Sequence, residues 1–147
     1  MSLEELLRDR IIRKTRPNRK LATDSLARAR RDIDTARTLI SNRKLDWSLA
    51  VSYNSMLQAG RALMFDQGYI PSSKEGHVAV VKFLRASLGA EIVDRVVMVL
   101  NGLRKKRHRI VYEAMDIVSG DEAEQALKWA EEFVKRIDGI LQKKPGT

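Results

Sequence analysis

The sequence predicts an all-α protein, with one domain over residues 1–147 folded as an antiparallel up-and-down bundle of four to five helices. Apolar residues recur at helical spacing along most of the chain, and no strand-like alternation extends over a useful length. The segments between the helices are short, which favours antiparallel neighbours. A length of 147 residues with 44% apolar residues suits one domain around one core.

The first helix is expected over the first 16 residues. Ser2 and Glu5 form a capping-box pattern, in which the serine caps the helix and the glutamate reaches back. Pro17 ends the helix, because proline pushes the preceding residue out of the helical region. The apolar stripe of this helix consists of Leu3, Leu6, Leu7 and Ile11.

Two long helices are expected next, over residues 20–41 and 46–67. Apolar positions of the first follow alternating steps of four and three, which is typical of a seam for helix packing. Asp46 is a suitable N-cap for the second. That second helix is apolar nearly all round, so we expect it to be the central element of the bundle. Its small residues Ala59 and Gly60 would permit close approach of a neighbour.

The second half of the chain contains two further long helices and one short one. The last helix begins at another capping box, formed by Ser119 and Glu122. The expected elements are a loop over 68–73, a short helix over 76–87, a fourth long helix over 91–111 and a last helix to about residue 142, with a frayed tail over 143–147.

The charge balance favours polyanionic partners. The formal net charge is +9 and the isoelectric point about 10.1, and such an excess attracts RNA, DNA, nucleotides or an acidic protein. A well-solvated basic surface is the alternative interpretation. Cysteine is absent, which excludes disulfides, thiolate metal sites and thiol nucleophiles. The sequence has no glycine-rich phosphate loop and no repeated Glu-x-x-His pattern, so we expect no cofactor and no metal.

Two observations bear on cellular location. The N-terminal residues lack an apolar signal core. The most apolar tract, residues 92–103, is interrupted by Asp94 and Arg95 and is too short to span a bilayer. We therefore expect a cytoplasmic protein that does not enter a membrane.

The fourth long helix carries the candidate functional residues. Arg104, Arg107, His108 and Tyr112 lie at i, i+3, i+4 and i+8, so one helical face carries them in line. Guanidiniums clamp phosphate, and imidazole binds phosphate or moves protons near neutral pH. The alternative is a solvated basic helix end. The predicted phosphate- or nucleic-acid-binding residues are Arg104, Lys105, Arg107 and Arg109, and the candidate catalytic residues are His108, Arg107 and Tyr112.

Other residues of interest receive structural interpretations. His77 opens the short helix and is interpreted as a cap or surface residue. Trp47 and Trp129 are interpreted as core or helix-edge residues. The N-terminal basic residues are interpreted as a solvated face, with nucleic-acid contact as the alternative: Arg8, Arg10, Arg13, Lys14, Arg16, Arg19 and Lys20.

Two segments resemble the HEPN domain family. The first begins at Ser48 and continues through Gly68 and Pro71 to His77. It is similar to a family segment in which a tyrosine-containing helix is followed by an Ala-Arg-Ala-Leu stretch, a glycine turn and a Ser-His helix start. The second is similar to the arginine-rich signature helix of the family. The resemblance covers roughly residues 20–141 and leaves the first helix as an addition. The matching stretches are Ser48-Leu49-Ala50-Val51-Ser52-Tyr53, Gln58-Ala59-Gly60-Arg61-Ala62-Leu63 and Leu103-Arg104-Lys105-Lys106-Arg107-His108-Arg109-Ile110-Val111-Tyr112-Glu113.

The resemblance implies a helical bundle that often dimerises with its two signature helices facing each other. Many members are metal-independent endoribonucleases or components of toxin–antitoxin pairs, frequently with a minimal nucleotidyltransferase as partner. Others have lost catalysis and bind RNA, nucleotides or proteins.

The signature helix departs from the catalytic form of the motif, which places a histidine five to seven positions after an arginine. Five positions after Arg107 stands Tyr112, and His108 follows Arg104 by only four. A phenol with a pKa near 10 is a poor base at neutral pH. The leading hypothesis is therefore a homodimeric protein that binds RNA or nucleotides, in a toxin–antitoxin or nucleotidyltransferase-associated module. The alternatives are a metal-independent endoribonuclease toxin using Arg107 and His108, and a non-catalytic protein-interaction subunit.

Overall fold

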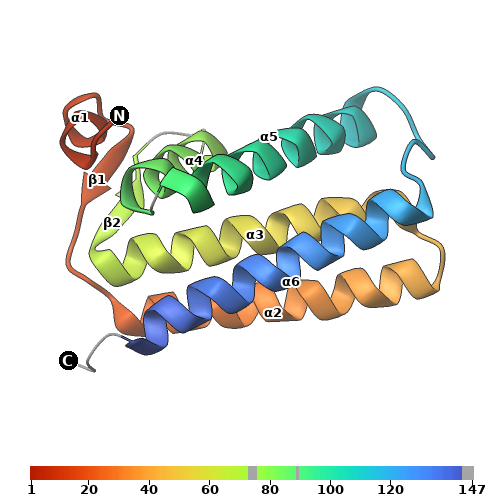
Figure 1. Cartoon of the computed structure of the whole chain (residues 1–147), viewed down its shortest axis with the longest axis horizontal. Coiled ribbons are helices and arrows are strands. Elements are labelled where there is room, and N and C mark those ends of the chain that lie inside the picture. The colour runs from red at the N-terminus through yellow and green to blue at the C-terminus, as the bar shows by residue number, and fades with distance from the viewer. Residues whose placement is uncertain (73–75, 89, 144–147) are drawn as a thin grey trace.

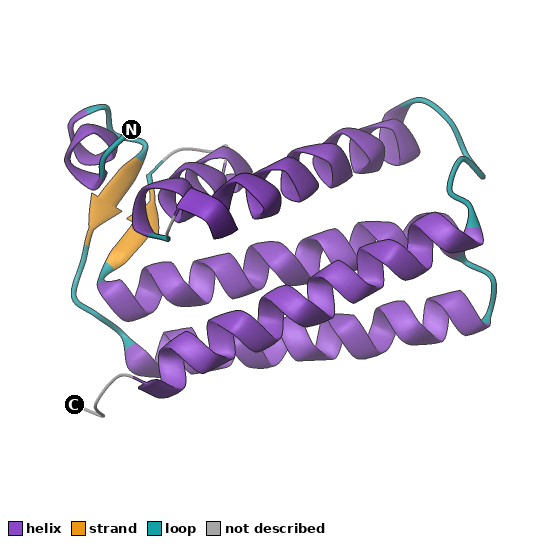
Figure 2. Cartoon of the chain, in the orientation of Figure 1, coloured by secondary structure: helices purple, strands orange, loops and turns teal. Residues whose placement is uncertain are grey.

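The computed structural model describes residues 1–72, 76–88 and 90–143 (Figure 1). Most of these residues are helical, so the predicted all-α bundle is confirmed (Figure 2). The elements are α1 (Leu3–Arg8), β1 (Ile12–Lys14), α2 (Arg19–Ser41), α3 (Leu45–Gln67), β2 (Tyr69–Pro71), α4 (Gly76–Ser87), α5 (Ala90–Tyr112) and α6 (Gly120–Lys143).

Helix α3 is the centre of the bundle, as the sequence predicts. It packs against α2 and α6 on one side and against α4 and α5 on the other (Figure 1). Its buried residues surround most of its circumference. Three buried serines tie α2 to α3 by donating hydrogen bonds of 2.8–2.9 Å to carbonyl oxygens of the facing helix: Ser25, Ser48 and Ser55.

Gly60 allows α4 to approach α3 closely. A Cβ atom at Gly60 would lie 2.5 Å from Cγ1 of Val80 and 3.4 Å from Cδ1 of Leu84. The first distance is well inside van der Waals contact, so only glycine fits here without a shift of its neighbours. The expected close approach at Gly60 is confirmed, and it fixes the position of α4, whose second residue is His77.

The prediction of one helix over the first 16 residues was wrong beyond Arg8. The backbone of Arg10 turns into the left-handed region (φ 58°), and the chain then enters β1, which pairs antiparallel with β2. Strands of three residues are too short to display a period of two, so the second appeared in the sequence as part of a loop. The paired residues are Ile12 with Pro71, Arg13 with Ile70 and Lys14 with Tyr69.

Gly68 joins this small sheet to the end of α3. Its backbone is left-handed (φ 87°), and a Cβ there would lie 2.8 Å from the carbonyl oxygen of Thr15. The N–H of Thr15 donates to the carbonyl of Gly68 over 2.8 Å. A glycine at the helix C-cap is therefore required both by the backbone conformation and by the neighbouring chain.

The start of α3 also differs from expectation. The N-cap residue is Lys44, without a side-chain cap, so the predicted cap role of Asp46 was wrong. The carboxylate of Asp46 instead accepts hydrogen bonds from the backbone N–H groups of Asp116 and Val118, at 2.7 and 3.1 Å. Asp46 thereby anchors the segment between α5 and α6 to the start of α3.

The capping box at α6 is confirmed. The backbone N–H of Ser119 donates to the Glu122 carboxylate, and the N–H of Glu122 donates to the Ser119 hydroxyl, over 3.2 and 3.1 Å. At the other end Lys143 is the last residue of α6, while 144–147 of the predicted frayed tail lie outside the described residues. Within the described part of the chain, none of the helices combines the length and apolar character that crossing a membrane requires.

Candidate functional site

A cavity of about 820 Å³ lies between the start of α4 and the C-terminal half of α5. We call it the α4/α5 pocket. The structure brings all six sequence-predicted site residues to its wall, together with His77 and Val78 from α4. The full lining is His77, Val78, Arg104, Lys105, Arg107, His108, Arg109, Tyr112 and Glu113.

The cations on this wall differ in their pairing. Arg109 forms an exposed ion pair with Glu113 (3.8 Å). In residues 1–72, 76–88 and 90–143, the structure shows no carboxylate in ion-pair contact with Arg104, Lys105 or Arg107. Within the described residues, three positive charges therefore converge on the pocket without an ion-pair partner, because the acidic lining residue Glu113 pairs with Arg109.

Lys106, in the middle of the same basic run, belongs to another surface. Its ammonium lies 3.1 Å from the Glu122 carboxylate at the start of α6. The helical period turns this residue away from the neighbours on either side of it. The run therefore divides into cations that line the pocket and one that ties α5 to α6.

Two aromatic rings stand at the mouth of the pocket. The rings of His108 and Tyr112 are one helical turn apart, with centroids at 4.8 Å and an interplanar angle of 45°. Tyr112 is 73% exposed and His108 is also exposed. Surfaces that bind single-stranded nucleic acid commonly combine exposed aromatic rings with cations.

His77 makes a second pair with a tyrosine, on the α4 side of the pocket. Its Nδ1 lies 3.3 Å from the Oη of Tyr53, and the two rings stack with centroids 5.9 Å apart at an angle of 11°. Tyr53 is 1% exposed and His77 is half-buried. The interpretation of His77 as a cap or surface residue missed this contact, although Tyr53 and His77 both lie in the segments that resemble the family.

Three guanidiniums act on this tyrosine–histidine pair. Burial lowers the pKa of His77, and the charges of Arg107, Arg61 and Arg104 lower it further. Burial raises the pKa of Tyr53, while the same three arginines oppose that rise. The imidazole is consequently neutral at pH 7 and the phenol stays protonated.

Arg61 is a site residue that sequence reasoning did not select. It projects from α3, is half-buried, and its guanidinium lies 3.4 Å from the position that a Cβ would take on Gly76. Burial lowers the pKa of Arg61. Its charge thus lies at the start of α4, beside His77. Spacing along one helix could not predict this, because Arg61 and His77 lie on different helices.

The chemistry available here suits a phosphate group. Guanidiniums supply charge and paired N–H donors, and a neutral imidazole accepts or donates a proton near neutral pH. In the described ranges, no three side chains of the histidine, cysteine, aspartate and glutamate types lie close enough together to hold a metal ion.

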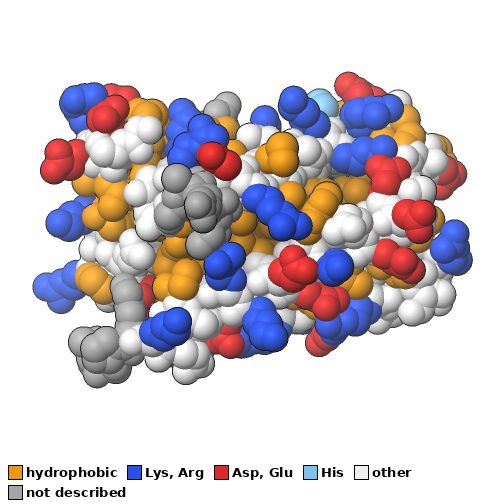
Figure 3. Space-filling view, in the orientation of Figure 1, with side chains coloured by type: hydrophobic (Ala, Val, Ile, Leu, Met, Phe, Trp, Pro, Cys, Tyr) orange, Lys and Arg blue, Asp and Glu red, His pale blue; other side chains and the backbone are white. Residues whose placement is uncertain are grey.

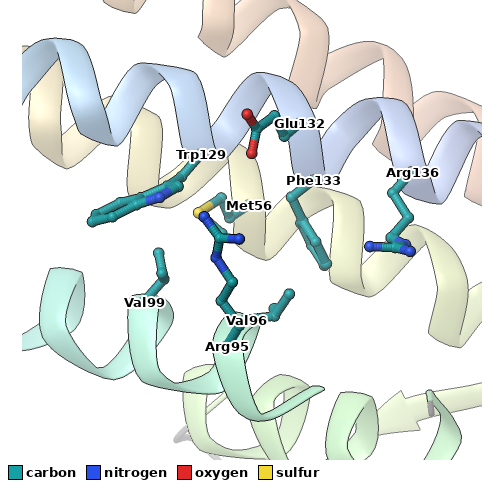
Figure 4. Close-up of a pocket in the computed structure, with 8 residues that line it drawn as sticks. All are labelled: Met56, Arg95, Val96, Val99, Trp129, Glu132, Phe133 and Arg136. Atoms are coloured by element: carbon teal, nitrogen blue, oxygen red, sulfur yellow. The ribbon is translucent and has the colours of Figure 1, made fainter. Parts of the chain in front are cut away.

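A second hollow has a different character. Figure 3 shows apolar side chains between α5 and α6, and Figure 4 shows Trp129, Met56 and Phe133 around a cavity of about 270 Å³ there. Arg95 reaches across it from α5, and a neighbouring cavity of about 570 Å³ is also mostly apolar. This α5/α6 groove suits an apolar side chain rather than a phosphate. The half-buried Trp129 lies at its edge, whereas Trp47 is exposed at the start of α3.

Comparison with known proteins gives one result. The chain matches no curated protein and no solved structure at a significant level. The family model described as the HEPN domain matches residues 22–140, which takes in α3, α4 and α5 whole and most of α2 and α6. The match covers well over half of the chain and includes every residue of the α4/α5 pocket. The chain belongs to the HEPN domain family.

Proposed function

We propose that this HEPN domain binds RNA, or nucleotides that share its phosphate chemistry, in the α4/α5 pocket. The observation that carries the proposal is the convergence of Arg104, Lys105 and Arg107, none of which has an ion-pair partner among the residues that the structure describes. Like charges held together cost free energy unless an anion neutralises them, so the arrangement favours an anionic ligand.

The pocket offers places for two parts of a nucleotide. Arg104 and Arg107 would hold a phosphate, and the exposed rings of His108 and Tyr112 would face a base. Base stacking on aromatic side chains tolerates any sequence, because every base has a π-face. The ion pair of Arg109 is exposed and of little worth, so Arg109 is free to exchange Glu113 for a second phosphate.

Titration of a fluorescent single-stranded RNA with the protein, followed by anisotropy, tests this proposal. Three such cations should give affinities that fall with salt, with a slope of log K against log salt of about −2. Protein purified at moderate salt should also carry nuclease-sensitive material that absorbs at 260 nm. A slope near zero, or no binding at low salt, would contradict the proposal.

We also propose that the chain is a homodimer with α5 at the interface. Family resemblance favours this, and the outward face of α5 is exposed at steps of four and three. Two of its side chains are large and unusually open, Met98 at 70% and Tyr112 at 73%. The exposed positions of this face are Met98, Gly102, Lys105, Arg109 and Tyr112.

Replacement of Met98 by glutamate should weaken this dimer about tenfold or more, because a charge would be buried in the interface. Sedimentation equilibrium would measure the change against a monomer mass of 16.8 kDa. Ala27→Glu is the matched control, since Ala27 is exposed on α2, away from α5. Equal dimer affinities in the two variants would place the interface elsewhere.

The proposed setting is a toxin–antitoxin or nucleotidyltransferase-associated module, as the family resemblance implies. Two features support contact with a partner protein. The α5/α6 groove offers an apolar surface. The open ring of Tyr112 is within reach of a partner enzyme at the mouth of the pocket.

A further inference from the structure

The first 20 residues carry a second concentration of positive charge. They contain seven lysines and arginines and three acidic residues, so they contribute +4 to the formal net charge of +9. The family match begins at residue 22, and these residues therefore lie outside it. Figure 3 shows basic side chains at the edge of the molecule where α1 and β1 lie in Figure 1. This charge belongs to a surface other than the α4/α5 pocket.

The structure separates these seven cations into two groups. The paired ones are Arg8 with Asp9 (3.6 Å), Arg19 with Asp66 (3.2 Å) and Lys20 with Asp24 (3.0 Å). The other four are exposed and have no ion-pair partner within the described ranges: Arg10, Arg13, Lys14 and Arg16. These four lie in or next to β1, and we call them the β1 cations.

The backbone that carries the β1 cations is held by the rest of the molecule. Arg13 and Lys14 lie in β1, which pairs with β2, and Thr15 donates its N–H to the carbonyl oxygen of Gly68 over 2.8 Å. Arg10 adopts a left-handed backbone conformation (φ 58°), which is uncommon for a long side chain. Because this backbone is already ordered, less conformational entropy is lost when the cations bind a ligand.

We propose that the β1 cations bind the phosphate backbone of the same RNA strand that enters the α4/α5 pocket, so that the ligand is a polynucleotide rather than a mononucleotide. This inference rests on the proposed function, because the pocket supplies the first contact. The mutual repulsion of the β1 cations favours an anionic ligand, as it does in the pocket. Phosphate contacts carry no sequence information, so β1 adds affinity for a strand of any sequence.

Helix α3 gives the separation of the two surfaces. His77 of the pocket contacts Tyr53, whereas β2, the partner of β1, follows soon after Gln67 at the end of the same helix. The step of 14 residues from Tyr53 to Gln67 corresponds to about 21 Å along the helix axis. A strand whose phosphates lie about 3.4 Å apart, as in a duplex, covers this distance with about six nucleotides. A longer strand therefore reaches both surfaces, and a very short one occupies a single surface.

A membrane surface is the other anionic partner that a basic segment could meet. Peripheral membrane segments insert apolar side chains next to their cations. The apolar residues of α1 and β1 face the core instead: Leu6 and Ile12 are fully buried, and Leu3 and Leu7 are partly buried against the core. The segment thus presents charge without an apolar surface, which favours RNA.

Anisotropy titrations of the full chain with labelled single-stranded RNAs of three and sixteen nucleotides test this inference. For the wild type, the slope of log K against log salt should be about −2 with the short strand and about −5 with the long one, since the β1 cations add four phosphate contacts. Combined replacement of Arg13, Lys14 and Arg16 by glutamine should weaken long-strand binding about tenfold or more at low salt and make its slope shallower by about 2. Short-strand affinity should fall by no more than about twofold, because the pocket remains.

The chain offers a matched control and a rescue. Combined replacement of Arg28, Arg31 and Lys128 by glutamine removes the same charge from exposed positions on α2 and α6, and should weaken long-strand binding much less. Arg13→Lys with Arg16→Lys keeps the charge and should bind the long strand like the wild type. Equal midpoints of urea unfolding would show that the variants are folded. If the triple glutamine variant is unstable, Arg13→Gln alone should still make the long-strand slope shallower by about 0.7.

The outcomes are distinguishable from those of the proposed function. Equal long-strand affinities of the β1 variant and the wild type would overturn this inference and leave the proposed function intact. Equal losses in the β1 variant and its control would also overturn it, because net charge would then attract the strand. Long-strand binding that survives removal of Arg104 and Arg107 would remove both proposals. Cosedimentation with vesicles of phosphatidylcholine and phosphatidylserine that needs the β1 cations, when RNA binding does not, would assign β1 to a membrane surface and overturn the inference.

Discussion

Simultaneous replacement of Arg104 and Arg107 by alanine is expected to weaken RNA binding by about 100-fold at low salt. Each guanidinium-to-phosphate hydrogen bond contributes roughly 1.5 kcal/mol or more, and two such losses correspond to about 3 kcal/mol. The slope of log K against log salt should also become shallower by about 1.4, since two phosphate contacts disappear from a single strand. Anisotropy titrations at several salt concentrations measure both quantities.

The chain offers a closely matched control for this variant. Arg28 and Arg31 are both exposed on α2, three positions apart like Arg104 and Arg107. Each double alanine variant lowers the formal net charge of +9 by two. If the net charge alone attracted RNA, the two variants would lose the same affinity. Equal losses would therefore contradict a site at the α4/α5 pocket, and a loss confined to α5 would support it.

The parts of this molecule that a single helix determines were predictable from sequence. The face shared by Arg104, Arg107, His108 and Tyr112 follows from helical spacing alone, and the structure places all four on one pocket. The central position of α3 followed from its apolar residues on every side. The capping box at Ser119 followed from a local pattern of four residues.

Features that depend on contacts between distant segments were not predictable in this way. Tyr53 and His77 are 24 positions apart and meet only because α4 folds back on α3. Arg61, which is also on α3, lies near the same tyrosine–histidine pair. The pairing of β1 with β2 joins residues nearly 60 positions apart through three-residue strands. Asp46 looks like a helix cap locally, and its bonds to a loop 70 positions away were hidden from any local rule.

The close contact of Gly60 on α3 with Val80 on α4 gives the second large prediction. Gly60→Ala should lower the free energy of unfolding by about 1–3 kcal/mol, because the new methyl group would meet Cγ1 of Val80 at 2.5 Å. Valine is stiff about its first side-chain bond, and Leu84 closes the other side, so the neighbours yield little. The higher helix propensity of alanine offsets up to about 1 kcal/mol of this cost.

Urea unfolding of two further variants, Gly139→Ala and Val80→Ala, tests whether the contact at Gly60 causes this loss of stability. Gly139→Ala, in an exposed part of α6 where a Cβ meets no atom within 4 Å, should stabilise the protein by about 0.5–1 kcal/mol. Val80→Ala alone opens a cavity, but in the Gly60→Ala background the same change makes room for the new methyl group. The double variant should thus be more stable than the sum of the single changes by about 0.5–3 kcal/mol. A Gly60→Ala variant that behaves like Gly139→Ala would show that α4 does not press on α3.

Gly60→Ala should also affect the two walls of the α4/α5 pocket differently. The cations that would hold RNA stand mainly on α5, whereas His77 depends on the seating of α4 against Gly60. A methyl group at Gly60 pushes α4 outward and should loosen the 3.3 Å contact between His77 and Tyr53. RNA affinity should then change little, because the cations on α5 keep their places, and Val80→Ala in the same chain should recover the stability. Parallel loss of RNA affinity and stability would instead mean that both walls move as one body.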